Sequence, residues 1–184
     1  MAWFNTGEML APKTAPFAFK TPRNKSGKRC SNQADTRIWY NYCFPRHNNK
    51  TFTGQVDTSF GIFYFNVKNV TDPETFNNKL GSLMVQIEQR LLSQKMKGLG
   101  KERLNPFVTL YALVQCTRDL SEISCAQCLA ISVSNFPTFC NNRKGCRVLY
   151  SSCYVRYELY PFFLSLDSNN IGASKKTMRV IIYP

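Results

Sequence analysis

Three cysteines close together in the second half of the chain constrain the fold more than any other feature. Cys116 and Cys125 are separated by eight residues, and Cys125 and Cys128 by two. Residues 107–115 are apolar and rich in β-branched and aromatic side chains, which favours a buried strand. Short polar residues at 119–121 can cap a helix, and apolar residues recur at helical spacing until the next proline. Because Cys125 and Cys128 share one helical face, the pattern predicts a helix bonded covalently to a sheet.

The cysteine content indicates an oxidising compartment. The chain has eight cysteines in 184 residues and a single histidine, His47, which is not at metal-ligand spacing from any of them. Disulfides are therefore expected, together with export to the secretory pathway or the cell exterior. The Cys125–Cys128 pair also matches a redox motif or half of a zinc site. Without a second such pair or a nearby histidine, structural bridges are favoured, and no metal site or cofactor is expected.

The charge pattern and the lack of a catalytic base argue against two classes of function, nucleic-acid binding and catalysis. A net charge of +13 favours acidic partners. The basic residues are scattered through predicted loops and ends and lack the basic-aromatic pattern of nucleic-acid-binding proteins, so no nucleic-acid partner is expected. A nucleophile needs a base, and the only histidine lies in a predicted loop. We therefore expect no catalytic residues and no enzyme activity.

One long helix is predicted before the cysteine triplet. Thr71 and Glu74 match a capping box, with Pro73 in the first helical turn. Residues 72–94 should then form an amphipathic helix with one buried face. Its apolar stripe consists of Phe76, Leu80, Leu83, Met84, Ile87 and Leu91.

The remaining segments have strand or loop character. Residues 58–66 suggest a strand, and residues 147–163 alternate and become aromatic as one or two strands. A polar turn region is expected at 44–54, and a basic, glycine-containing loop at 95–106. Residues 1–29 show no periodicity and are expected to be unstructured or non-homologous.

The two ends bear on localisation. Residues 1–29 contain no apolar stretch typical of a signal peptide, so export requires a true N-terminus that this chain lacks. Residues 166–184 are expected to be a linker and a truncated juxtamembrane segment, whose apolar run is too short to span a bilayer. Membrane attachment is expected only through a missing C-terminal segment.

Three segments resemble one plant family. They are Asn69-VTDPETF, Tyr111-ALVQCTRDLSEISCAQCL and Gly145-CRVLYSSCYVRYELYPF. In these segments the chain resembles the ginkbilobin-type, or salt-stress/antifungal, cysteine-rich repeat. The complete repeat covers residues 51–165, and residues 30–50, which contain Cys30 and Cys43, resemble the tail of a truncated first repeat. Cysteine-rich receptor-like kinases and secreted repeat proteins share this arrangement, and no kinase motif occurs here.

The resemblance implies an α+β fold, with two helices packed on an antiparallel sheet of about five strands and stapled by disulfides. It implies the bridges Cys116–Cys125 and Cys128–Cys153. Cys140 normally pairs with a cysteine before the first helix, but Phe65 stands at that position here. Cys146 becomes the candidate partner of Cys140.

The resemblance also implies a sugar site. The antifungal member of the family has three sugar-contacting positions that fall on Asn66, Arg147 and Glu158. An amide, a guanidinium and a carboxylate offer paired donors and acceptors to sugar hydroxyls. Arg147 and Glu158 could instead form a cross-strand ion pair. Because Phe65 replaces the bridging cysteine, Asn66 is expected to be loosely held and binding to be weak.

Two functions remain open. The first is an extracellular recognition module, lectin-like, that binds a mannose-type glycan or cell-wall polysaccharide in defence or stress signalling. The alternative is a protein–protein interaction ectodomain that contacts other cysteine-rich repeat proteins. Three glycosylation sequons, at Asn24, Asn49 and Asn69, agree with a location in the apoplast or on the outer face of the plasma membrane.

Overall fold

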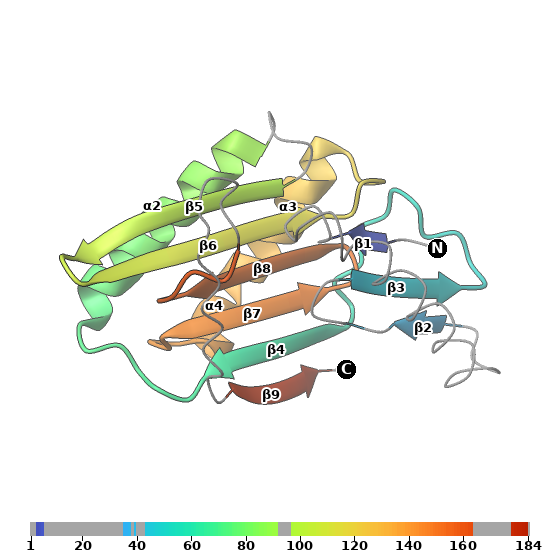
Figure 1. Ribbon diagram of the computed structural model, residues 1–184. Coiled ribbons are helices and arrows are strands. Elements are labelled where there is room, and N and C mark those ends of the chain that lie inside the picture. The colour runs from blue at the N-terminus through green and yellow to red at the C-terminus, as the bar shows by residue number, and fades with distance from the viewer. Residues whose placement is uncertain are drawn as a thin grey trace, which may run out of the picture.

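An antiparallel sheet forms the centre of the computed structural model (Figure 1), which describes residues 3–5, 35–37, 39, 43–91, 97–163 and 178–183. Its strand order is β5-β6-β8-β7-β4-β9. The strands are β4 (Gly61–Asn66), β5 (Lys97–Asn105), β6 (Val108–Cys116), β7 (Gly145–Tyr150), β8 (Cys153–Glu158) and β9 (Met178–Tyr183). Short hairpins connect β5 to β6 and β7 to β8, so these strands are neighbours in sequence and in space.

The helices cover one face of this sheet (Figure 1). They are α2 (Pro73–Leu91), α3 (Glu122–Ser134) and the short α4 (Phe136–Phe139). All six residues of the predicted stripe on α2 are buried. They join one core with the helix-facing side chains of the strands, such as Phe63, Val148 and Tyr157. The predicted α+β class, with two main helices on a five-stranded antiparallel sheet, is confirmed, and β9 is a sixth strand beside β4.

Three disulfides staple the helical layer. Cys116–Cys125 joins the end of β6 to α3, and Cys128–Cys153 joins α3 to the start of β8. Cys140–Cys146 closes the turn between α4 and β7. These pairs match the two implied bridges and the candidate pairing of Cys140. The side chain of Cys43 and all of Cys30 lie outside the described residues.

The helix starts agree in part with the predicted caps. Ser121 caps α3, because its Oγ accepts a hydrogen bond from the backbone N–H of Ser124. At α2 the predicted capping box is wrong. Asp72 Oδ1, not Thr71, accepts the hydrogen bond from the Thr75 N–H at 3.1 Å. A carboxylate there also complements the positive end of the helix dipole.

The predicted basic loop at 95–106 is a second correction, because Lys97–Asn105 form strand β5. Glycine is unfavourable in a strand, and the glycines suggested a loop. The structure shows why they are there: a Cβ at Gly98 would lie 2.3 Å from Ile87 Cγ2 on α2. The two glycines at positions 98 and 100 let the helix approach the sheet closely.

A small three-stranded sheet, of order β1-β3-β2, lies at one end of the main sheet (Figure 1). Its strands are β1 (Trp3–Asn5), β2 (Asp35–Arg37) and β3 (Cys43–Asn48). Part of the expected unstructured start is therefore a strand, and part of the polar turn region at 44–54 is too.

Asp57 connects this small sheet to the main sheet. Its Oδ2 lies 2.6 Å from Arg46 Nη2 and 3.2 Å from Arg37 Nη2. The backbone N–H of Asp57 donates to Ser152 Oγ in the β7–β8 turn at 2.8 Å. Two ion pairs and a hydrogen bond therefore join the small sheet to the main sheet.

The end of the chain also differs from the prediction. Part of the expected linker and juxtamembrane segment forms β9, which pairs with all of β4 from Gly61↔Tyr183 to Asn66↔Met178. An apolar run rich in β-branched residues has strand propensity. Too short to span a bilayer, it serves here as an edge strand.

Candidate functional site

The sheet face opposite the helices carries the predicted sugar-contacting residues. Successive side chains of a strand point to opposite faces. Phe63, Cys146 and Tyr157 belong to the core under the helices. Asn66, Arg147 and Glu158 each lie an odd number of residues from one of them on the same strand, so they point to the other side. We call this side the open face, meaning the face that carries no helix.

Arg147 and Glu158 meet on the open face, as the sequence predicted for a site or an ion pair. Arg147 Nε lies 3.8 Å from Glu158 Oε1, and the Glu158 side chain is 1% exposed while that of Arg147 is 22% exposed. The structure adds Arg156, which the sequence analysis missed. Its Nε and Nη2 donate to the same Oε1 at 3.1 and 3.0 Å. Arg156 stands two residues before Glu158, so strand alternation alone places both on one face.

Glycine at position 145 makes room for the buried carboxylate. Gly145 pairs with Glu158 across β7 and β8. A Cβ at Gly145 would lie 1.9 Å from Glu158 Oε2. Burial raises the pKa of Glu158, while the charges of Arg156 and Arg147 oppose that shift. The net effect leaves the pKa of Glu158 above its ordinary value. The contacts of its Oε1 with Arg156 and Arg147 make the carboxylate the shared partner of the two guanidinium groups.

Asn66 lies at the end of β4, on the same face but not bonded to the other two. Its Oδ1 accepts a hydrogen bond from the Lys68 N–H at 3.0 Å, and its side chain is among the buried polar groups. In the described part of the chain, its hydrogen bonds do not reach Arg147 or Glu158. The expectation of a loosely held amide is wrong, because the turn to Lys68 and the pairing with β9 fix this residue.

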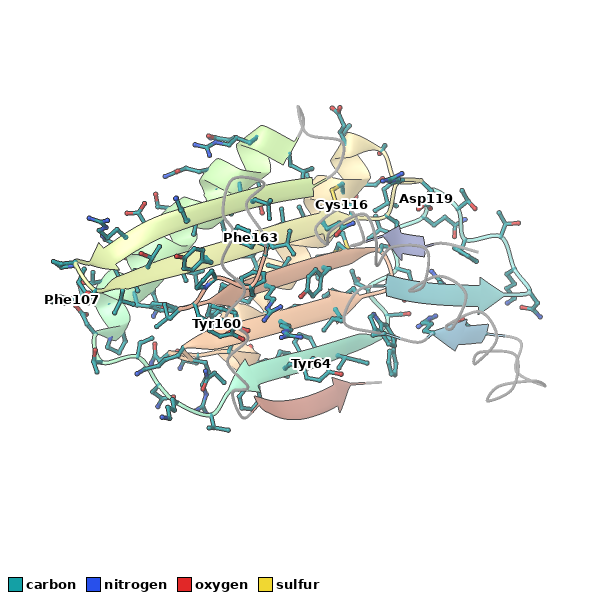
Figure 2. The ribbon with its side chains drawn as sticks, in the orientation of Figure 1. Tyr64, Phe107, Cys116, Asp119, Tyr160 and Phe163 are labelled. Carbon is teal, nitrogen blue, oxygen red and sulfur yellow. A yellow bond between two sulfur atoms is a disulfide. The ribbon has the colours of Figure 1, made fainter. Side chains whose placement is uncertain are left out.

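Aromatic residues after β8 fold back onto the open face, where Figure 2 shows Tyr160 and Phe163. Tyr160 Oη accepts from Arg156 Nη2 at 3.2 Å. The centroid of the Phe162 ring lies 3.9 Å from the Arg156 guanidinium carbon. Phe163 packs against Tyr111 of β6. Arg156 is thus held from three sides, whereas Arg147 faces Tyr64 across β7 and β4.

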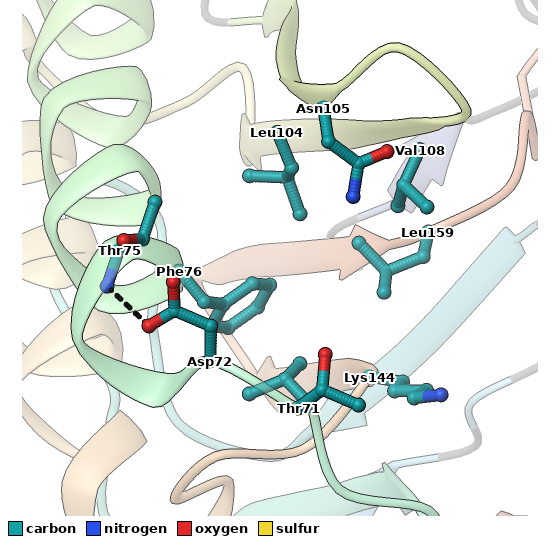
Figure 3. Close-up of a pocket in the computed structure, with 10 residues that line it drawn as sticks. Thr71, Asp72, Thr75, Phe76, Leu104, Asn105, Val108, Lys144 and Leu159 are labelled. Carbon is teal, nitrogen blue, oxygen red and sulfur yellow. Dashed lines mark hydrogen bonds between the residues drawn. The ribbon is translucent and has the colours of Figure 1, made fainter.

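A separate hollow of about 200 Å³ lies between the start of α2 and the tip of the β5–β6 hairpin (Figure 3). Phe76, Leu104 and Leu159 form apolar parts of its lining, and Lys144 lies at its edge. Asp72 also lines it, but its carboxylate caps α2 (Figure 3). None of the three predicted sugar-contacting residues lines this hollow.

Two of the three sequons lie in the described residues. Asn49 is exposed in the bend after β3, and Asn69 is exposed before α2. Asn69 Oδ1 accepts a hydrogen bond from Arg143 Nη1 at 2.8 Å. Asn24 lies outside the described residues, and glycosylation stays a prediction at all three.

Two further kinds of feature, a metal site and a membrane-spanning helix, are absent from the described residues. Within them, no three His, Cys, Asp or Glu residues gather as metal ligands. Over those same residues, no helix is both long and apolar enough to cross a membrane.

Sequence comparisons identify the kind of domain. The family model described as salt stress response/antifungal matches residues 65–160. Cysteine-rich repeat secretory protein 55 of Arabidopsis thaliana is 56% identical over 149 residues, which are 79% of this chain and 57% of that protein. An antimicrobial ginkbilobin-2-like protein of Castanea crenata is 37% identical over 137 residues, 74% of this chain and 57% of that protein. The chain thus spans just over half the length of these relatives.

Structural comparison supports the same fold. The tandem DUF26 ectodomain of the Arabidopsis thaliana cysteine-rich receptor-like protein PDLP8 superposes with a TM-score of 0.70. The match covers 86% of this chain and 73% of that one, at 24% identity. At this identity the likeness shows the fold, which agrees with the sheet and helices described above.

Proposed function

Because this chain belongs to the salt stress response/antifungal family, we propose that it is an extracellular recognition module that binds a carbohydrate on its open face. Similar proteins are named as secretory proteins and as a receptor-like ectodomain. Three disulfides suit the oxidising conditions outside the cell. The extracellular type of the domain follows from the family, and the sugar is the proposal.

The observation that carries this proposal is the partly exposed guanidinium of Arg147, anchored by a buried carboxylate. A guanidinium offers several donors in a fixed fork, and sugar hydroxyls are suitable acceptors. The ion pair with Glu158 and the partial burial of Arg147 reduce the side-chain freedom that is lost on binding. Tyr64 is the register partner of Arg147 on β4, so it presents a phenol side chain on the same face.

The roles of the three predicted residues then differ. Arg147 contacts the sugar, and Glu158, almost fully buried, positions Arg147. Asn66 supports the end of β4 and uses its amide oxygen internally. With one main contact residue, the affinity for a mannose-type sugar is expected to be about millimolar, or roughly 4 kcal/mol.

An NMR titration of the whole chain with mannose tests the proposal. Backbone signals of β4, β7 and β8 should shift, and the shifts should vanish in Arg147→Ala. Arg103→Ala, an exposed residue of β5, removes the same charge away from the site and should titrate like the wild type. If signals stay put at high sugar concentration, or if both variants lose binding equally, the carbohydrate proposal fails.

A second function, contact with another cysteine-rich repeat protein, is favoured by one observation. Phe107 is 96% exposed in the turn between β5 and β6, where Figure 2 shows it at the hairpin tip. A large aromatic side chain in full contact with water gains free energy when a partner covers it. Sedimentation with a tandem-repeat relative should show a complex that Phe107→Ser weakens. A complex of unchanged strength in that variant would place the contact elsewhere.

A further inference from the structure

Two arginines stand directly opposite each other at the centre of the open face. Arg147 on β7 pairs in register with Arg156 on β8. Like charges in directly opposed positions destabilise a strand pair. Such an arrangement persists only when other groups offset the repulsion.

Among the described residues, the carboxylate of Glu158 is the counter-charge that both arginines contact. Glu158 Oε1 is the shared partner of both guanidinium groups, at 3.0 Å from Arg156 Nη2 and 3.8 Å from Arg147 Nε. The count is two positive charges and one negative, which leaves a net charge of +1. Arg147 Nε, moreover, is buried and has no hydrogen-bond partner among the described residues.

The unbalanced charge belongs to Arg147 rather than Arg156. Arg156 has its bonds to Glu158 and Tyr160 and stacks on Phe162. Within the part of the chain that the structure describes, the ion pair of Arg147 is the longer contact to Glu158, and Arg147 is the more exposed of the two arginines, at 22% against 12%. Glu158 lies against Gly145, where even a Cβ would clash, so its carboxylate is held in place beside Arg156.

From this we infer that the site prefers an acidic sugar, a uronate. The carboxylate of the uronate pairs with Arg147, and its hydroxyls contact Tyr64 and the ends of the neighbouring strands. This inference rests on the proposed carbohydrate function and specifies its ligand class. A charge-assisted hydrogen bond between a guanidinium and a carboxylate is about twice as strong as a neutral one. Arg147 therefore recognises an acidic sugar better than its neutral counterpart.

The test compares D-galacturonate with D-galactose, which differ only at carbon 6, by NMR titration of the whole chain. Galacturonate should bind about ten-fold tighter at low salt, and added salt should reduce that ratio. Arg147→Gln should bring the two affinities together. Arg103→Gln, with the same change in net charge, should keep the preference. Arg147→Lys keeps the positive charge but not the forked guanidinium, so it should retain part of the preference. This variant keeps the test informative if Arg147→Gln does not fold.

The outcomes separate the two claims. Equal affinity for galactose and galacturonate overturns the acidic preference but leaves sugar binding intact. Displacement of galacturonate by acetate at equal concentration overturns it as well, because the site would then recognise an anion alone. If mannose, galactose and galacturonate all fail to bind, the proposed function itself fails.

Discussion

At the scale of single residues, Glu158 decides whether the open face holds together. It is 1% exposed and faces two guanidinium groups. Glu158→Gln leaves both partly buried arginines without a counter-charge, which should cost roughly 3 kcal/mol of unfolding free energy. Glu102→Gln is a matched control, because the ion pair of Glu102 with Lys79 is partly exposed, at 38% and 34% for the two side chains, and should contribute about 0–1 kcal/mol. Urea unfolding measures both, and equal losses would contradict a structural role for Glu158.

Asp57 gives a second prediction, on acid sensitivity. Burial raises its pKa, but hydrogen bonds from Ser59 and the charges of Arg37 and Arg46 outweigh that effect, so the pKa lies below the ordinary value of 3.8. A carboxylate with a depressed folded pKa contributes stability that is full above the ordinary value and is lost as the pH falls through the folded pKa.

The variant Asp57→Asn separates this effect from general acid unfolding. At neutral pH it should unfold about 1.5–3 kcal/mol more easily, since charged hydrogen bonds are lost and Arg46 is left buried. Below the folded pKa of Asp57 the difference from the wild type should shrink, as thermal unfolding between pH 7 and pH 2 would show. A difference that is constant with pH would rule out the ionic link.

At the scale of elements, strand β5 shows where sequence patterns mislead. Its glycines serve the close approach of α2, so Gly98→Ala should cost about 1–3 kcal/mol through overpacking against Ile87. Gly81→Ala on α2 is the control, because nothing lies within 4 Å of its added Cβ. That change should stabilise by about 0.5–1 kcal/mol. Chemical denaturation of both variants distinguishes the cases, and a stabilising Gly98→Ala would show that the helix can move away.

The elements that the sequence predicted well are those that depend on local residue spacing alone. The stripe on α2 and the cap at Ser121 depend on local spacing, and both are confirmed. Strand β5 depends on its close packing against α2, and strand β9 depends on its pairing with β4, which is far away in sequence. Local sequence patterns contain neither contact. The pairing of Arg147 with Glu158 came from the family resemblance. Strand alternation alone places Arg156 on the same face as Glu158, two residues further along β8. The position of Arg156 opposite Arg147 depends on the register between β7 and β8.

At the scale of the whole molecule, export is open to test through Asn49. Its side chain is exposed in a bend, and it begins the sequon Asn49-Lys-Thr51. The chain expressed with a signal peptide should lose mass on deglycosylation, and Asn49→Gln should remove part of that loss. Asn48→Gln, which lies outside the sequon, should change nothing. No mass shift in any of these proteins would contradict glycosylation at this site.

The disulfides should not contribute equally to the stability of the molecule. Cys128–Cys153 spans 25 residues, Cys116–Cys125 nine and Cys140–Cys146 six. Bridges that close longer loops restrict the unfolded chain more, with typical contributions of about 2–4 kcal/mol. Cys128–Cys153 also binds α3 to the centre of the sheet, and both sulfur-bearing residues are fully buried. Replacing this pair by two alanines should therefore destabilise the protein most, because packing is lost along with the entropic restriction.

The matched comparison is the double variant Cys140→Ala, Cys146→Ala, which opens only the turn before β7. Non-reducing peptide mapping first verifies the three pairs in the wild type. Guanidinium unfolding under oxidising conditions then ranks the variants, with the smallest loss expected for the pair of residues 140 and 146. Equal losses for the two pairs would contradict this ranking, because restriction of the unfolded chain alone predicts a smaller loss for the bridge that closes the shorter loop.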